Sequence, residues 1–172
     1  MYLSSSATIW RGVSSSTGGR IGYRLYPFDA VNLGRMAQVA IGLGSNMGDR
    51  QAHIEAAIAL LREVVADLRV SRLIETAPMY VTDQPAYLNG AAIGYTDLGP
   101  LALLARLKSI ESEVGRTPSV RYGPREIDLD LLAYGRVAFR SSGRLEVPHP
   151  RTPERRFVLE PLAELDPKLH LP

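Results

Sequence analysis

Two aspartates, Asp128 and Asp130, interrupt the otherwise apolar segment from Ile127 to Leu132, and carboxylates in such a segment need a chemical reason. In a β-strand, residues two apart point to the same face and lie about 6.6 Å from each other. Carboxylate oxygens are the protein ligands that Mg²⁺ prefers, and two-metal sites hold their ions about 3.5–4 Å apart. The Asp-x-Asp spacing therefore predicts a site for two Mg²⁺ ions that also binds substrate phosphates.

The residues just upstream decide between this metal site and a plain surface strand whose aspartates face water. Arg121 and Arg125 precede the aspartates and flank the Gly123-Pro124 turn. Guanidinium groups bind phosphate oxygens in bidentate fashion, so these arginines can meet the oxygens that metal ions leave free. The arginines and the turn favour the metal and phosphate site.

Composition limits the classes of protein to consider. A chain of 172 residues predicts one domain with a core of its own, and the absence of cysteine excludes disulfides and thiolate metal sites. No apolar run approaches the roughly 20 residues that span a bilayer, so we expect a soluble, cytoplasmic protein with no membrane partner. The 20 basic and 18 acidic residues are too evenly balanced for a general nucleic-acid-binding surface, although a pI near 9.0 allows an anionic ligand.

The chain divides at Met36 into a leader, residues 1–35, and a domain, residues 36–172. The leader is rich in Ser, Gly and Arg, contains Asp29 as its single acidic residue and lacks an apolar period. This composition predicts a disordered or loosely attached segment. An organellar transit peptide is one alternative. A tail or an over-extended start before Met36 is favoured.

Alternating periodicities predict the elements that position the aspartates. A β-α-β-β-α-β order emerges, which is typical of an α+β fold with an antiparallel sheet and both helices on one face. Pro100 opens the second helix and Gly115 ends it, while Pro78 and Pro85 exclude regular structure between the second and third strands. The expected elements are strand 39–43, helix 54–68, strand 69–75, loop 76–87, strand 91–95, helix 100–114, the Asp-bearing strand, a further strand 144–147 and a tail rich in Pro and Leu.

Three further features suggest ligand contacts, each with a structural alternative. Gly44, at the end of the first strand, lets a flat ligand approach the backbone, whereas the glycine spacing does not fit a dinucleotide fingerprint. Tyr87 can stack on a heterocycle whose edge Asn89 reads, or they can be a core tyrosine and a strand-end cap. His149, held between prolines, and Arg155 can form a phosphate cradle, or the histidine can be purely structural.

Taken together, these segments resemble the 6-hydroxymethyl-7,8-dihydropterin pyrophosphokinase family of folate biosynthesis. The resemblance covers residues 38–167 and implies a ferredoxin-like α+β fold. It also implies that ATP donates its β,γ-diphosphate to the pterin hydroxymethyl oxygen with two Mg²⁺ ions, leaving AMP. Four motifs carry it in order: Gly42-Leu-Gly-Ser-Asn46, Asp83-Gln-Pro-Ala-Tyr-Leu-Asn89, Arg121-Tyr-Gly-Pro-Arg-Glu-Ile-Asp-Leu-Asp130, and Val147-Pro-His-Pro150 with Arg155 and Phe157.

The resemblance also implies roles for individual residues. Tyr122 stands where the best-known members have Trp, and Lys108 stands where some members have Gln. The implied catalytic residues are Arg116 and Arg125, and the implied metal ligands are Asp128 and Asp130. The implied ATP contacts are Glu111, Arg121, His149 and Arg155, and the implied pterin contacts are Gly44, Thr76, Ala77, Met79, Tyr87, Asn89, Tyr122 and Phe157.

Two other classes of protein compete with this interpretation. A ferredoxin-like nucleic-acid module would carry aromatic residues on adjacent strands and no Asp pair on that surface, because carboxylates repel phosphate. A small-molecule sensor with a dead site would have no need for the arginines and aspartates that are intact here. We therefore expect ATP and a small-molecule pterin as ligands, no nucleic acid, and other folate-pathway enzymes as potential partners.

Overall fold

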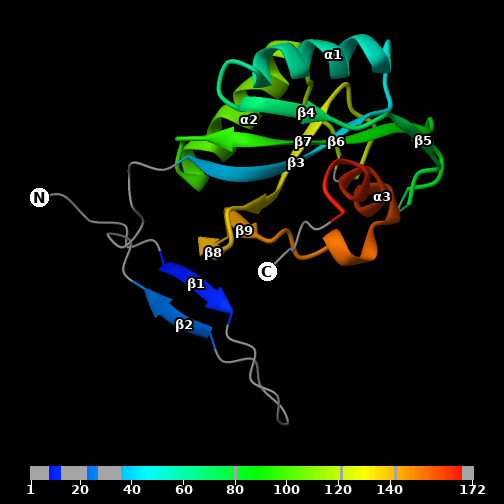
Figure 1. The fold of residues 1–172 in the computed structure, drawn as a ribbon. Coiled ribbons are helices and arrows are strands. Elements are labelled where there is room, and N and C mark those ends of the chain that lie inside the picture. The colour runs from blue at the N-terminus through cyan, green and yellow to red at the C-terminus, as the bar shows by residue number, and fades with distance from the viewer. Residues whose placement is uncertain are drawn as a thin grey trace, which may run out of the picture.

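The computed structural model describes residues 8–12, 23–26, 36–79, 81–120, 122–141 and 143–167 (Figure 1). The helices are α1 (Arg50–Leu61), α2 (Pro100–Val114) and α3 (Arg156–Leu165), with a short 3-10 turn, η2 (Thr152–Glu154). The strands are β1 (Thr8–Gly12), β2 (Tyr23–Tyr26), β3 (Ala37–Ser45), β4 (Ala66–Val70), β5 (Ile74–Thr76), β6 (Tyr87–Thr96), β7 (Asp128–Tyr134), β8 (Ala138–Ser141) and β9 (Leu145–Val147).

The central sheet has the strand order β4-β6-β3-β7, all antiparallel, with β5 pairing a further part of β6. Helices α1 and α2 cover one face and α3 covers the opposite face (Figure 1). This arrangement confirms the predicted α+β, ferredoxin-like fold. A second small sheet has the order β2-β1-β8-β9.

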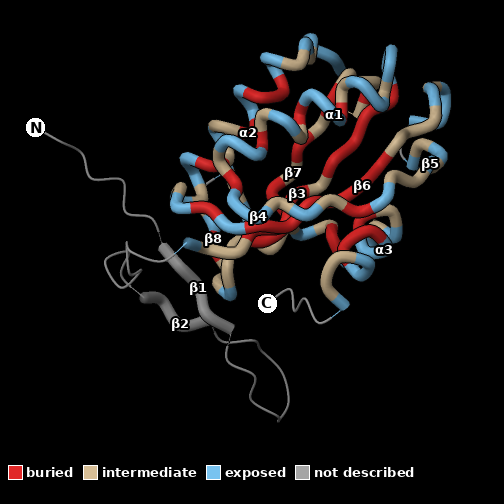
Figure 2. Tube along the Cα trace, turned by 45° about the horizontal axis from the view of Figure 1, so that its top comes forward, coloured by how far each residue is buried: buried red, intermediate tan, exposed pale blue. Residues whose placement is uncertain are grey.

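Both faces of β3 are buried, which explains its nearly continuous apolar sequence (Figure 2). Val39, Ile41 and Leu43 point toward α1 and α2 and pack in the larger core cluster. Ala40 points the other way and packs in a smaller cluster that includes Val158 of α3. The sheet is thus held between two layers of helix, and β3 lies in its interior.

The first helix is shorter than its apolar pattern predicts. Asp49 caps its N-terminus, with Oδ1 accepting a hydrogen bond from the Ala52 N–H at 3.0 Å. The helix ends at Leu61, whereas the pattern predicts helix to residue 68. Val64 and Val65 are β-branched and favour extended backbone, and the residues after them form β4 against β6. The second helix begins at Pro100 and ends at Gly115, as predicted.

The predicted strand 69–75 is two strands, β4 and β5, separated by a step at Ser71. The Ser71 N–H donates to the Ala91 carbonyl at 2.9 Å, and the Ser71 hydroxyl accepts from the Ala91 N–H at 3.0 Å. A side-chain oxygen thus takes the place of a strand carbonyl, and the chain steps away from the ladder there. The sequence pattern does not show such a local exchange of partners.

The tail that is rich in Pro and Leu contains α3, a helix that the sequence pattern did not predict, and β8 was not predicted either. Pro161 lies inside α3, where proline removes a helical hydrogen bond. Val158, Pro161 and Leu162 are nevertheless buried, because their i, i+3, i+4 spacing puts one apolar stripe against the sheet. Burial on the sheet outweighs the local preference of proline.

Residues 1–35 lie mostly outside the described part of the chain. Within them, β1 pairs with β2 and with β8. The leader and the domain boundary at Met36 therefore stay predictions.

Deletion of residues 1–35 tests this boundary. Both core clusters of the described residues lie between Val39 and Leu165, so we expect the melting temperature to fall by no more than about 4 °C, roughly 1 kcal/mol. Calorimetry on the shortened and full chains measures this. A fall of about 10 °C or more would show that β1 stabilises the domain through β8 and that the boundary is wrong.

Candidate functional site

The aspartates lie on the face of the sheet that α3 partly covers. In the β3–β7 register, Gly44 faces Asp128 and Gly42 faces Asp130. A cavity of about 100 Å³ opens over these four residues. It is lined by Gly42, Leu43, Gly44, Thr76, Ala77, Met79, Gln84, Tyr87, Asn89, Gly90, Tyr122, Arg125, Asp128, Asp130, Leu132, Arg155, Phe157 and Val158.

All eight residues expected at the pterin site line this cavity, although they come from separate segments between β3 and α3. Tyr87 and Asn89 both face it from β6, and Phe157 closes it from α3. Thr76 accepts a hydrogen bond from Asn89 Nδ2 at 2.7 Å on its hydroxyl, which fixes the orientation of the amide. Aromatic walls and an oriented amide are suited to a flat heterocycle with polar edges.

Glycine at position 44 keeps the floor of the cavity open. A Cβ atom added to Gly44 would lie 3.1 Å from Asn89 Oδ1 and 3.9 Å from Asp128 Cβ. The first distance is tighter than ordinary packing, and Asn89 is held by Thr76. A larger residue here would therefore push on the Asn89 amide that lines the cavity.

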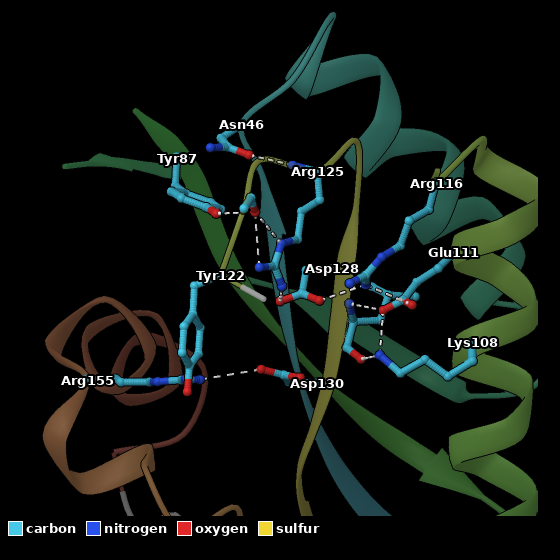
Figure 3. A network of polar contacts seen from close by, with 12 residues as sticks. Asn46, Tyr87, Lys108, Glu111, Arg116, Tyr122, Arg125, Asp128, Asp130 and Arg155 are labelled. Carbon is cyan, nitrogen blue, oxygen red and sulfur yellow. Dashed lines mark hydrogen bonds and ion pairs between the residues drawn. The ribbon is translucent and has the colours of Figure 1, made fainter. Parts of the chain in front are cut away.

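Three arginines converge on the two aspartates (Figure 3). Arg116 Nη1 lies 2.8 Å from Asp128 Oδ1, and Arg125 Nη1 lies 3.1 Å from Asp128 Oδ2. Arg155 Nη1 lies 3.4 Å from Asp130 Oδ2. Glu111 also contacts Arg116 and Lys108, so the four cations of this cluster exceed its three carboxylates by one formal charge, which favours an anionic ligand.

The surroundings keep this network ionised. Burial alone would raise the pKa of Asp128, but Arg125, Lys108 and Arg116 hold it below its usual value. Burial would likewise lower the pKa of Arg125, but Asp128 and Tyr87 raise it above its usual value. Near neutral pH Asp128 and Arg125 therefore face each other as a charged carboxylate and a charged guanidinium group.

Asn46 fixes the segment that carries Arg125, a role that the sequence analysis did not assign. The Arg125 N–H donates to Asn46 Oδ1 at 2.8 Å, and the Asn46 N–H donates to the Arg125 carbonyl at 3.1 Å. Asn46 Nδ2 donates in turn to Gln84 Oε1 at 3.1 Å, and Gln84 Nε2 donates to the Tyr122 carbonyl at 3.1 Å. Asn46 and Gln84 belong to the first two motifs of the family resemblance, and this is the feature of the sequence from which their role could have been predicted.

Glu111 lies behind the aspartates, and its side chain is only 4% exposed. Its Oε1 accepts from the Leu129 N–H at 2.7 Å and lies 2.6 Å from Lys108 Nζ. Its Oε2 lies 2.8 Å from Arg116 Nη1. The resemblance implies that Glu111 contacts ATP, but in the structure both carboxylate oxygens have protein partners.

A second cleft, of about 400 Å³, adjoins Asp130. His149 lines it, and burial lowers the pKa of His149. Asp130 raises this pKa, whereas Arg155 and Arg151 lower it further. The Arg151 N–H donates to His149 Nδ1 at 3.3 Å, which leaves the proton of the neutral ring on Nε2. The lining residues are Leu104, Lys108, Asp130, Leu131, Arg140, Ser141, Gly143, Arg144, Leu145, Glu146, His149 and Pro150.

The remaining predicted contact, Arg121, lies outside the described residues. Among the residues that the structure describes, no group of three or more His, Cys, Asp or Glu side chains could hold a metal ion. A pair of carboxylates still fits Mg²⁺, which keeps several waters and usually takes one or two protein carboxylates together with substrate phosphates.

Relatives of known name match about three quarters of this chain. The chain is 52% identical over 129 residues to the mitochondrial folate synthesis bifunctional protein of Pisum sativum; the match covers 74% of this chain and 25% of that protein. It is 46% identical over 127 residues to the 2-amino-4-hydroxy-6-hydroxymethyldihydropteridine pyrophosphokinase of Bacillus subtilis, covering 73% of this chain and 75% of that protein. The Pseudomonas aeruginosa protein of the same name is 40% identical over 141 residues, with 78% and 84% covered.

The chain thus spans only about a quarter of the plant relative but most of each bacterial one. Residues 40–167 match the family model described as 7,8-dihydro-6-hydroxymethylpterin-pyrophosphokinase. That range contains the aspartates, the arginines and the aromatic walls of the cavity. The chain therefore belongs to the 7,8-dihydro-6-hydroxymethylpterin-pyrophosphokinase family.

Proposed function

We propose that this chain transfers the β,γ-diphosphate of ATP to the hydroxymethyl oxygen of 6-hydroxymethyl-7,8-dihydropterin in folate biosynthesis. The hydroxymethyl oxygen bonds to the β-phosphorus, the bond from that phosphorus to the α,β-bridging oxygen breaks, and AMP leaves. The hydroxyl proton is released. The products are AMP and the pterin diphosphate.

The observation that carries this proposal is that Asp130 lines both cavities. The first cavity has the aromatic and amide groups suited to a pterin. The second has apolar residues and the cations Lys108, Arg140 and Arg144, which suit a nucleotide. Two ligands bound there would meet at the aspartates and arginines, where the diphosphate group passes from ATP to the pterin.

The arginines supply positive charge at this meeting point. Arg116 and Arg125 both bind Asp128, and Arg155 binds Asp130. Phosphoryl-type transfer needs little covalent help; it needs positioning and stabilisation of charge on the phosphate oxygens. We infer that these guanidinium groups turn from the carboxylates to phosphate oxygens when ATP is bound.

Mg²⁺ fits the aspartates, and we propose two ions held by Asp128 and Asp130. When bound, Mg²⁺ would neutralise charge on the phosphates and orient them. Arg125, Lys108 and Arg116 hold the pKa of Asp128 below its usual value, so this carboxylate is ionised at neutral pH, which is the form that binds a hard cation.

The direct test is an assay with ATP, Mg²⁺ and 6-hydroxymethyl-7,8-dihydropterin. We expect one AMP for each pterin diphosphate, and no product after chelation of the metal. Chromatography of the nucleotides and pterins measures both products. Formation of ADP, or of AMP without a pterin diphosphate, would overturn the proposal.

Substitution of Gly44 tests the pterin cavity separately. We expect Gly44→Ala to raise the KM for the pterin about 10- to 100-fold, as for an extra methyl group in a fitted pocket, and to change the KM for ATP little. Gly99→Ala is the matched control, because a Cβ there meets nothing within 4 Å. An unchanged pterin KM in Gly44→Ala would exclude this cavity as the pterin site.

No helix in the described part of the chain is long and apolar enough to cross a membrane. The cytoplasmic location and the folate-pathway partners remain proposals.

A further inference from the structure

The loop between β5 and β6 has residues of the pterin cavity at both of its ends. Thr76, the last residue of β5, and Ala77 stand at its beginning, and Tyr87, the first residue of β6, follows it. β5 is only three residues long and reaches its last pair with β6 at Thr76 and Tyr87. Because so short a strand forms few ladder hydrogen bonds, other contacts decide how firmly these two ends are held.

One guanidinium group, that of Arg50, contacts both ends of the loop. Arg50 Nη1 donates to the Ala86 carbonyl at 2.8 Å, and Arg50 Nη2 donates to Glu75 Oε2 at 2.9 Å. Glu75 directly precedes Thr76, and Ala86 directly precedes Tyr87. A planar guanidinium group carries several N–H donors in a fixed arrangement, so it can bind two acceptors at once. Arg50 thus bridges the two chain segments that carry residues of the pterin cavity.

The place of Arg50 in α1 is unfavourable for a cation. Arg50 is the first residue of α1, and the helix dipole destabilises positive charge at that end. Formation of the helix therefore gives no reason for an arginine there, whereas the two acceptors do. The Arg50 side chain is 31% exposed and that of Glu75 is 62% exposed, so water screens the ion pair between them. We expect the partly buried hydrogen bond to the Ala86 carbonyl to contribute more.

The turn between β3 and α1 holds two consecutive carbonyls at the end of this loop. Asn46 Nδ2 donates to the Pro85 carbonyl at 3.2 Å, next to the Ala86 carbonyl that Arg50 binds. Asn46 also binds the segment of Arg125, so its loss would disturb the phosphate end of the site as well. Among the described residues, the side chain of Arg50 donates hydrogen bonds only to the two loop ends, so its effect should be confined to the pterin end.

We propose that Arg50 is a positioning residue that fixes both ends of the β5–β6 loop and thereby sets the affinity for the pterin. This inference rests on the proposed function, because that function makes the pterin the ligand of the cavity, whereas the contacts of Arg50 belong to the free protein. Tyr87 would stack on the pterin ring before and during transfer alike. Its misplacement should therefore weaken binding of the ground state and the transition state equally, which raises KM and leaves kcat unchanged.

Three variants and one control test the proposal on the full chain. Arg50→Met keeps a long side chain and removes all the donors. Arg50→Lys keeps the charge and a donor for the Ala86 carbonyl but loses the paired N–H groups that bind two acceptors. Glu75→Gln keeps an acceptor and removes its charge. Arg62→Met is the control, because Arg62 is exposed at the other end of α1.

We expect Arg50→Met to raise the KM for the pterin about 10-fold, as for the loss of one hydrogen bond to a charged group. The KM for ATP and kcat should stay within about threefold of wild type. Arg50→Lys should raise the pterin KM only about threefold, because it retains one donor. Glu75→Gln and Arg62→Met should stay within about twofold of wild type, because exposed ion pairs contribute little.

Two measurements do not depend on turnover. Calorimetry gives the dissociation constant of the pterin in the presence of Mg²⁺ and α,β-methylene-ATP, in which carbon replaces the bridging oxygen that leaves in the proposed reaction. This constant should rise in Arg50→Met as the KM does. Amide hydrogen exchange on the free protein, followed by NMR, should be faster in β5 and residues 87–89 of Arg50→Met than in wild type and Arg62→Met.

The two substrates separate a positioning role from a general structural one. An unchanged KM and dissociation constant for the pterin in Arg50→Met would overturn the inference. Equal losses of affinity for ATP and pterin, together with a lower melting temperature, would overturn it as well, because Arg50 would then stabilise the whole domain. If Arg50→Met does not fold, Arg50→Lys decides, and wild-type pterin affinity with wild-type exchange in that variant overturns the inference.

Failure of the proposed function is visible in the wild type itself. If wild type makes no AMP and binds no pterin, that function fails, and the effect of Arg50 on pterin affinity fails with it. Faster exchange in Arg50→Met would then still support the contact of Arg50 with the loop ends, and unchanged exchange would overturn that part too. If wild type makes the pterin diphosphate and Arg50→Met matches it in every measurement, only this inference fails.

Discussion

Asp128→Asn should lower kcat by about 10³-fold or more while the protein stays folded. Asparagine keeps the shape of the side chain but removes the charge that would bind a metal ion, and metal stabilisation of several kcal/mol corresponds to about this factor. The fold should persist because Arg116 and Arg125, which contact Asp128, are only partly buried and retain other partners. Single-turnover formation of AMP and a melting curve measure the two effects. Asp130→Asn should behave in the same way.

Asp67→Asn is the matched control for this substitution. Asp67 is exposed and has a φ of 51°, a conformation that asparagine also tolerates, so neither activity nor melting temperature should change. Wild-type AMP formation by Asp128→Asn or Asp130→Asn would remove the metal site from the proposal. Loss of activity together with unfolding would instead show that the arginine network holds the fold together.

Local sequence patterns predict the elements whose partners lie next to them in the chain. The alternation around Asp128 predicts β7, and Pro100 with Gly115 predicts both ends of α2. Each of these residues acts on the backbone conformation at or next to its own position. The extent of α1 and the existence of α3 were decided by packing on the sheet. In α3, burial of Val158 and Leu162 on the sheet outweighs the unfavourable effect of Pro161 on a helix. The helix propensities of single residues give no information about that contact.

The candidate site shows the same division between features that a local motif predicts and features that depend on contacts between distant segments. The residue types that can bind a flat ligand or phosphate stand in motifs, and the fold brings eight expected pterin contacts into one cavity. The residues that hold the site are harder to predict. Asn46 and Gln84 are 38 residues apart, and Glu111 is 18 residues from Leu129, so only the folded sheet shows that they meet.

Arg125→Ala should lower kcat about 10²- to 10³-fold, the effect of losing a group that stabilises charge in the transition state. The affinities for ATP and pterin should change by less than about tenfold. The guanidinium group is only 16% exposed and lies 3.1 Å from Asp128 Oδ2. Pre-steady-state kinetics separates the chemical step from binding. Arg62→Ala is the control, because Arg62 is exposed at the end of α1.

The geometry around Arg125 explains why catalysis should suffer more than binding. Its backbone is fixed by two hydrogen bonds to Asn46, and its Nε and Nη2 donate to the Gly123 carbonyl at 3.2 and 3.1 Å. Because its backbone is held this firmly, the guanidinium group needs little further reorganisation in the transition state once it has turned to the transferring phosphates. Arg125→Lys keeps the positive charge but loses the planar guanidinium group and its paired N–H donors, and we expect it to recover only part of kcat. If Arg125→Ala instead weakened ATP or pterin binding tenfold and left kcat intact, Arg125 would be a binding residue and the catalytic role would belong to Arg116 alone.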